Sequence, residues 1–234
     1  MSLIVSSILV VSLSFFLGSS AVIEQDQFAI VYMASTIRLL FVFGLVLFVI
    51  FFIRRSFENK EIEYLLSRPI GRKSFVASYV VALMFLCCFF TLVATLINSL
   101  VGWSYIGEGY FLWSYSLFVE LMIMAVAALF FAMVLSSPVS AALVSCAFYA
   151  LSRLMGDLLG ISSDVYAGTS FELMSNAIKV VSLFTPRFDL LTQSSWLLYG
   201  VEGAVGFVVV TIQGITFVAV LTGATMIDLV KRQF

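Results

Sequence analysis

The sequence contains no histidine, and it has only three cysteines and three prolines among its 234 residues. The absence of histidine removes the commonest metal ligand and the only side chain that ordinarily titrates near neutral pH. Cys87 and Cys88 are adjacent in one apolar run, and Cys146 lies in another, so no CxxC spacing is present. We interpret all three cysteines as small buried hydrophobic residues. We therefore predict no metal site and no catalytic residue.

Charged residues are also scarce. They make up 11% of the chain, against about 25% in an average soluble domain. Hydrophobic residues make up 62%, and the mean hydropathy is +1.16, which excludes a water-soluble domain. The apolar runs are continuous, whereas strands of a membrane barrel alternate between apolar and polar residues. The sequence therefore predicts an all-α integral membrane protein with one transmembrane domain, residues 1–234. The net charge of −1 gives no indication of a nucleic-acid partner.

A membrane-spanning helix needs about 20 apolar residues, so this length allows six or seven spans with short loops. We predict six, over Leu3–Val22, Thr36–Ile53, Phe75–Val101, Phe111–Leu135, Val139–Gly156, and from either Trp196 or Val205 to Leu229. The first run has an alternative interpretation as a signal peptide, because Gly18–Ala21 resembles a cleavage site. It lacks the basic residues that normally precede such a segment.

Two weaker segments lie on the predicted outer side. Phe171–Phe184 is amphipathic and precedes Thr185-Pro186, so we expect a helix that lies in the outer interface before the sixth span. Aromatic residues near the third loop predict an interfacial belt, formed by Trp103, Tyr105, Tyr110 and Trp113.

The strongest local feature is the charged stretch 54–73, RRSFENKEIEYLLSRPIGRK, which holds six of the twelve Lys and Arg residues. Spans flank it on both sides, so it must be a solvated loop. Basic residues favour the cytoplasmic side. With both termini cytoplasmic, eight basic residues face inward and four outward. We therefore expect a multi-pass protein of the inner (plasma) membrane in that orientation.

Within this stretch the pattern predicts a short amphipathic helix followed by a turn. Ile62, Leu65 and Leu66 recur at helical spacing and form one narrow apolar face. Pro69 disfavours helix at the residue before it, and Gly71 permits a turn. The chain then re-enters the membrane near Phe75.

This stretch resembles the loop after the second helix of ABC-type-2 transporter permeases. The resemblance covers Glu58, Ile62-Glu63-Tyr64-Leu65-Leu66, Ser67-Arg68-Pro69-Ile70 and Arg72. In that family the loop contains a coupling helix that docks on a separate ATPase subunit. The resemblance thus implies ATPase-coupling residues here, namely Glu58, Glu61, Glu63, Leu65, Leu66, Arg68, Pro69 and Arg72. Glu61 departs from the family pattern, which frequently has glycine there, and the family's basic elbow helix is missing from the start of the chain.

The resemblance also implies the partners. ATP hydrolysis is expected on the separate ABC ATPase subunit, so this chain is not itself an enzyme and has no cofactor of its own. Two permease subunits, as a homodimer or heterodimer, are expected to form the membrane unit within the lipid. Most similar proteins export their substrate.

Three charged residues are candidates for a substrate path. Glu120 lies within the fourth predicted span, where a carboxylate is costly and is a functional candidate by default. Its alternative role is a hydrogen bond to Asn98 or Thr95 on a neighbouring helix. Arg38 and Arg153 lie near the predicted outer ends of spans that line the path in similar proteins, and there they could bind an anionic head group.

These arginines and several glycines also have purely structural interpretations. Both arginines could simply extend to the interface, and Arg153 could pair with Asp157, four residues on. Glycines at positions 156 and 160, and at 200, 203 and 206, could support close helix packing.

Two other functional classes remain open. A secondary transporter or channel is expected to show internal repeats or several charges within the membrane. A membrane scaffold that assembles a partner complex is expected to act without an ATPase.

Overall fold

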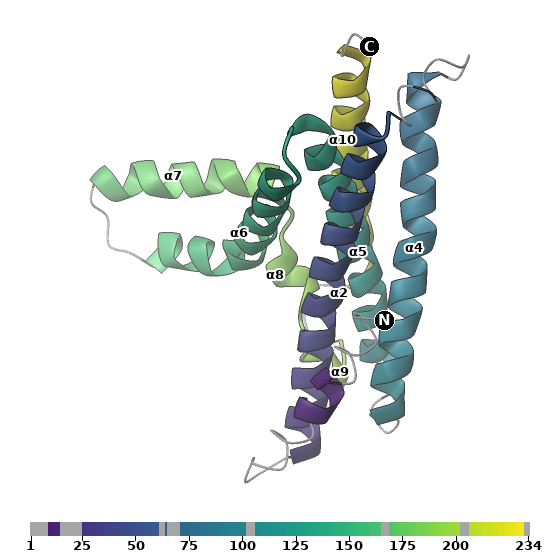
Figure 1. The fold of residues 1–234 in the computed structure, drawn as a ribbon. Helices are drawn as coiled ribbons and strands as arrows, with labels where there is room; N and C mark the ends of the chain where they lie inside the picture. Colours follow the sequence, from purple (N-terminus) through teal and green to yellow (C-terminus); the bar gives the residue numbers. More distant parts are fainter. Residues whose placement is uncertain are drawn as a thin grey trace.

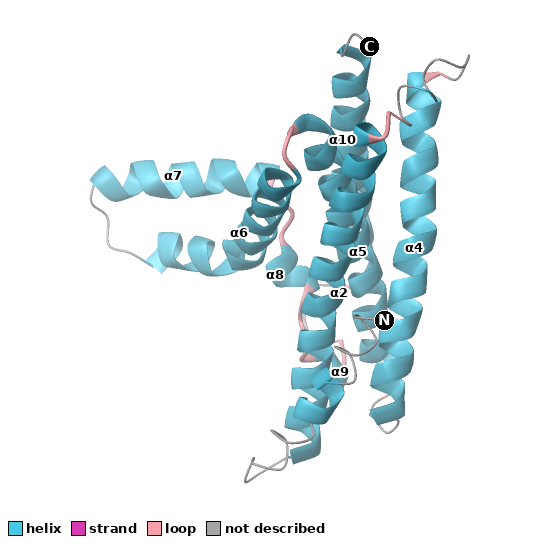
Figure 2. Ribbon diagram, in the orientation of Figure 1, coloured by secondary structure: helices cyan, strands magenta, loops and turns pink. Residues whose placement is uncertain are grey.

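The computed structural model describes residues 9–14, 25–60, 64, 71–101, 106–164, 169–201 and 206–231. Within these ranges all regular secondary structure is helical, as Figure 2 shows. Residues 9–14 are helical, and the remaining helices are α2 (Gln25–Glu58), α4 (Arg72–Val101), α5 (Glu108–Val134), α6 (Pro138–Asp164), α7 (Thr169–Phe184), α8 (Phe188–Leu191), α9 (Trp196–Tyr199) and α10 (Phe207–Lys231).

Five of the described helices are long and apolar enough to cross a membrane, namely α2, α4, α5, α6 and α10. By helix length and hydropathy the chain is therefore a multi-pass membrane protein. The first predicted span lies outside the described residues except for 9–14, so the count of six spans stays a prediction.

The second span was predicted to begin at about Thr36, and the helix that contains it starts earlier in the chain. Helix α2 begins at Gln25 and runs for 34 residues. Residues 28–35 are largely apolar and continue the helix toward the N-terminus. The earlier start places Arg38 about 20 Å along the helix instead of near its end.

Helix α5 forms the centre of the bundle. It packs against α2, α4, α6 and α10, and nearly every residue between Leu112 and Met133 is buried or nearly so. Apart from Glu120 and a few small polar residues such as Ser116, it is apolar around its circumference, and a helix of that kind belongs in a core. By contrast α4 exposes a row of large apolar residues, including Phe85, Leu92 and Leu100, as expected for a face toward lipid.

Helices α6 and α7 form an arm. Figure 1 shows the far part of α6 and the whole of α7 running side by side away from the bundle. Chain residues 185–199 return along the bundle through α8 and α9 before α10 begins. The predicted helix Phe171–Phe184 is confirmed as a helix, and its position relative to a membrane stays a prediction.

The sixth predicted span is one continuous helix only in its later part. Helix α9 ends at Tyr199, and Gly200 follows with φ of 76°, the left-handed region that glycine adopts without strain. Helix α10 then ends at the same end of the bundle at which α2 ends and α4 begins (Figure 1).

Glycine allows close approach at three places. A Cβ on Gly109 would lie 1.9 Å from the Trp196 carbonyl oxygen, and one on Gly214 would lie 2.7 Å from a Val119 methyl carbon. A Cβ on Gly156 would lie 2.6 Å from the Asp189 carboxylate. Gly156 was among the glycines proposed for close packing, whereas Gly160, Gly200 and Gly206 have open space around them. Gly203 lies outside the described residues.

Candidate functional site

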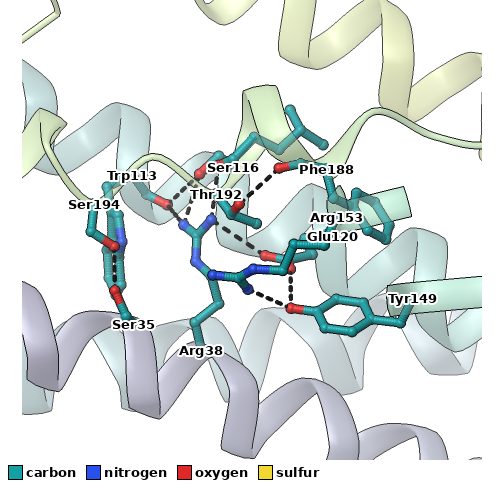
Figure 3. A network of polar contacts seen from close by, with 11 residues as sticks. Ser35, Arg38, Trp113, Ser116, Glu120, Tyr149, Arg153, Phe188, Thr192 and Ser194 are labelled. Carbon is teal, nitrogen blue, oxygen red and sulfur yellow. Dashed lines mark hydrogen bonds and ion pairs between the residues drawn. The ribbon is translucent and has the colours of Figure 1, made fainter. Parts of the chain in front are cut away.

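Arg38 of α2 and Glu120 of α5 form a salt bridge in the interior of the bundle. Arg38 Nη1 lies 3.3 Å from Glu120 Oε2, and neither side chain has any exposed surface. Glu120 lies twelve residues into α5, about 18 Å from its start. The two residues therefore meet near the middle of both helices. Figure 3 shows the pair and its neighbours from close by.

The Arg38 guanidinium makes three further polar contacts. Its Nη1 donates to the Leu191 carbonyl oxygen at 2.8 Å, which connects α2 to α8. Its Nη2 donates to the Trp113 carbonyl oxygen at 3.0 Å and to Ser116 Oγ at 2.9 Å, both on α5. The Trp113 ring lies 5.2 Å from Arg38 Cζ, a cation–π distance. Arg38 thus holds three helices together from one buried point.

Tyr149 extends this network toward α6. Its hydroxyl donates to Glu120 Oε1 at 2.9 Å and accepts a hydrogen bond from Arg153 Nη1 at 2.8 Å. The Tyr149 ring packs between Phe43 and Phe188, with ring centroids 5.5 and 5.7 Å away. A continuous polar path therefore runs from the fully buried Glu120 to the part-exposed Arg153 (Figure 3).

Arg153 lines a pocket of about 540 Å³ between α2, α6 and the chain around α8. The pocket is also lined by Phe43, Tyr149, Ala150, Leu154, Asp157, Asp189 and Thr192. Burial of an isolated charge is costly, and in the core Arg38 and Glu120 are each paired with the other. Arg153 is the remaining cation of the network, and it lies at the pocket.

The structure brings Arg38, Glu120 and Arg153 into one network, although their predicted surroundings are partly wrong. Arg38 does not extend outward, because its side chain is fully buried and bonds to groups of α5 and α8 inside the bundle. Glu120 pairs with Arg38 and Tyr149 rather than with Asn98 or Thr95. Thr95 Oγ1 bonds to the carbonyl oxygen of Leu92.

Arg153 also differs from its predicted surroundings. Helix α6 continues to Asp164, so Arg153 lies well within the helix rather than at its end. Within the described residues no ion pair joins Arg153 to Asp157, and Arg153 bonds to Tyr149 instead.

Three residues of the network were not predicted. Ser116 and Tyr149 had no distinguishing signal, except that Tyr149 precedes Arg153 by one helical turn. Trp113 was assigned to an interfacial belt, and it is wholly buried against Arg38 instead. Trp103 and Tyr105 lie outside the described residues.

Most of the predicted ATPase-coupling residues also lie outside the described residues. These are Glu61, Glu63, Leu65, Leu66, Arg68 and Pro69. Glu58 is exposed as the last residue of α2, and Arg72 is the first residue of α4. Just after α2, Lys60 adopts a left-handed φ of 58°, which ends the helix before the remainder of the charged stretch.

The cysteines match their predicted burial only in part. Cys87 is buried and Cys146 is half-buried, but Cys88 is exposed on the apolar face of α4. In the described part of the chain, no three His, Cys, Asp or Glu residues are grouped closely enough to hold a metal ion.

Comparison with models of known protein families and with curated proteins found no match to this sequence.

Proposed function

We propose that this chain is the membrane-spanning permease subunit of an ABC transporter, driven by a separate ATPase subunit that docks on residues 54–74. The observation that carries the proposal is the charged stretch, with its coupling-loop pattern, between two long apolar helices. In this proposal the stretch faces the cytoplasm, both termini are cytoplasmic, the protein resides in the plasma membrane, and two permease subunits form the export pathway.

The helices on either side of the stretch are suited to carry movement inward. Helices α2 and α4 have 34 and 30 residues and pack against each other and against α5. Arg54, one turn before the end of α2, donates from Nη1 to the Leu135 carbonyl oxygen at 3.1 Å and from Nη2 to that of Ser136. A force on the end of α2 therefore also acts on the turn between α5 and α6.

The buried network supplies a candidate substrate path. Arg38 on α2 contacts α5 and α8, and Tyr149 joins the same network to α6. A tilt of α2 driven by the ATPase would change these contacts and the pocket beside Arg153. We assign Arg38, Glu120 and Arg153 to this path, with the pocket as the place where substrate first meets it.

Co-purification tests the proposal directly. Tagged wild-type chain, expressed in its native host, should retain a P-loop ATPase, and the charge reversals Glu63→Lys and Arg68→Glu should abolish that retention. Glu108→Lys is the matched control, because Glu108 is the exposed first residue of α5, which begins at the opposite end of the bundle from the end of α2 (Figure 1). Absence of an ATPase from the wild-type eluate, or its undiminished retention by both reversals, contradicts the proposal.

One observation favours a second candidate, an ATP-independent transporter. The structure groups Arg38, Glu120 and Arg153, whereas from the sequence only Glu120 was expected deep within a span. Ionisable groups inside a membrane commonly mark ion or proton pathways. Transport by the purified chain alone in vesicles, driven by an ion gradient without ATP, would select this candidate and exclude the first. A membrane scaffold predicts no transport by the chain in vesicles, whether an ion gradient or ATP is supplied.

A further inference from the structure

The pocket beside Arg153 contains one cation and one carboxylate that form no ion pair among the described residues. Arg153 has five N–H donors and uses one of them on Tyr149. Asp157 is exposed, one turn further along α6, and forms no ion pair with Arg153. Asp189, the other acid at the pocket, is already bound by Arg187 at 2.8 Å. The unmatched charges are therefore one of each sign.

We propose that this pocket binds the head group of a zwitterionic amphiphile, with Arg153 on its phosphate and Asp157 on its primary ammonium group. A ligand with a single charge would pair with one of these two side chains and leave the other without a counter-charge at the pocket. A head group with both signs satisfies both, which lowers the cost of keeping these charges there. The proposed ligand class is thus a phosphoethanolamine lipid rather than an anionic lipid.

The walls of the pocket suit the remainder of such a molecule. Phe43, Ala150, Leu154 and the Tyr149 ring are apolar surfaces beside the two charges. The volume of about 540 Å³ falls within the roughly 300–1,000 Å³ of typical ligand pockets. Guanidinium binds phosphate through paired N–H donors, and Arg153 has such donors available.

Binding of a head group at this pocket would also affect the buried Arg38–Glu120 ion pair. A phosphate that attracts the Arg153 guanidinium would draw it away from the Tyr149 hydroxyl, and Tyr149 is the group that bonds to Glu120. Head-group occupancy would thereby be communicated to Arg38 and to α2. The head-group site names the substrate class of the proposed transporter and in that respect rests on the proposed function. Binding of the head group itself requires no ATPase.

Native mass spectrometry of the purified full chain, without ATPase, tests the inference. The probes are phosphatidylethanolamine, phosphatidylglycerol and phosphatidylcholine with identical acyl chains. Wild type should retain phosphatidylethanolamine about tenfold better than phosphatidylglycerol, the difference expected when one charged hydrogen bond is lost. Arg153→Gln should reduce retention of all three lipids, and Arg153→Lys should restore part of it.

Asp157→Asn separates the zwitterion from a simple anion site. It should remove the preference for phosphatidylethanolamine over phosphatidylglycerol and leave phosphatidylglycerol retention unchanged or higher. Lys179→Gln, at an exposed position on α7 that does not line the pocket, is the control and should behave as wild type.

Equal retention of all three lipids by wild type, or an Asp157→Asn variant that keeps the preference, overturns the inference. Loss of ATPase co-purification with lipid preference intact would contradict only the proposed function. Retention of the ATPase without any preference for phosphatidylethanolamine would contradict only the head-group site.

Discussion

The Arg38 guanidinium and the Glu120 carboxylate lie 3.3 Å apart with no exposed surface on either side chain. They join α2, which leads into the charged stretch, to α5, the central helix of the bundle. Because Arg38 also bonds to the Leu191 carbonyl oxygen, this one pair fixes three segments relative to each other. Its energetics therefore bear on both stability and any movement of α2.

Glu120→Gln should destabilise the protein. The substitution preserves shape but leaves the Arg38 charge without its counter-ion, and breaking a buried pair in this way costs about 3–5 kcal/mol. Thermal unfolding in detergent, followed by tryptophan fluorescence, measures the effect. The double variant Arg38→Met/Glu120→Leu removes both charges and should recover most of the loss. An unchanged melting temperature for Glu120→Gln would show that the pair contributes no net stability.

Tyr149→Phe should uncouple Arg153 from Glu120 while keeping the ring contacts to Phe43 and Phe188. Loss of a hydroxyl that serves a buried carboxylate costs about 1–3 kcal/mol. Tyr199→Phe is the matched control, because Tyr199 is 65% exposed and should tolerate the change. If both variants unfold at the same temperature as wild type, the bridge through Tyr149 has no energetic role.

The long helices were predictable because their sequence signal is continuous. Helix α4 was predicted as Phe75–Val101 and begins only three residues earlier, and α6 begins one residue before its predicted start. Two boundaries were missed: α2 begins at Gln25 rather than Thr36, through the acidic and amide residues 25–27, and α6 ends at Asp164 rather than Gly156. Hydropathy measures transfer into lipid, so it cannot distinguish a polar helical turn from a loop.

The site was only partly predictable, for a different reason. Glu120 was singled out because a carboxylate in an apolar run is conspicuous by itself. Its partners were not, since Arg38 and Tyr149 come from α2 and α6, and only the packing of α5 between these helices brings them together. Close packing at Gly109 and Gly214 could not be predicted from the sequence either, because it depends on which residue of another helix lies opposite each glycine.

Gly214→Ala should destabilise the contact between α5 and α10. The added methyl group would lie 2.7 Å from a Val119 methyl carbon in a buried interface, and overpacking of this kind costs about 1–3 kcal/mol. Gly223→Ala on the same helix is the control, because nothing lies within 4 Å of its Cβ position. It should be neutral or slightly stabilising, since alanine favours helix by up to about 1 kcal/mol over glycine. Adding Val119→Ala should rescue Gly214→Ala, and failure to do so would exclude this contact as the cause.

Cysteine labelling tests the orientation on which the transporter proposal depends. In a variant with Cys87, Cys88 and Cys146 replaced by serine or alanine, Tyr64→Cys places one thiol in the charged stretch, at a position that is 63% exposed. Glu108→Cys places one at the first residue of α5, which begins at the opposite end of the bundle (Figure 1). Basic loops remain on the cytoplasmic side. A membrane-impermeant maleimide should therefore label Tyr64→Cys only in inside-out vesicles and Glu108→Cys only in right-side-out vesicles. The reverse pattern would place the charged stretch outside the cell, where no ATP-driven subunit could act on it.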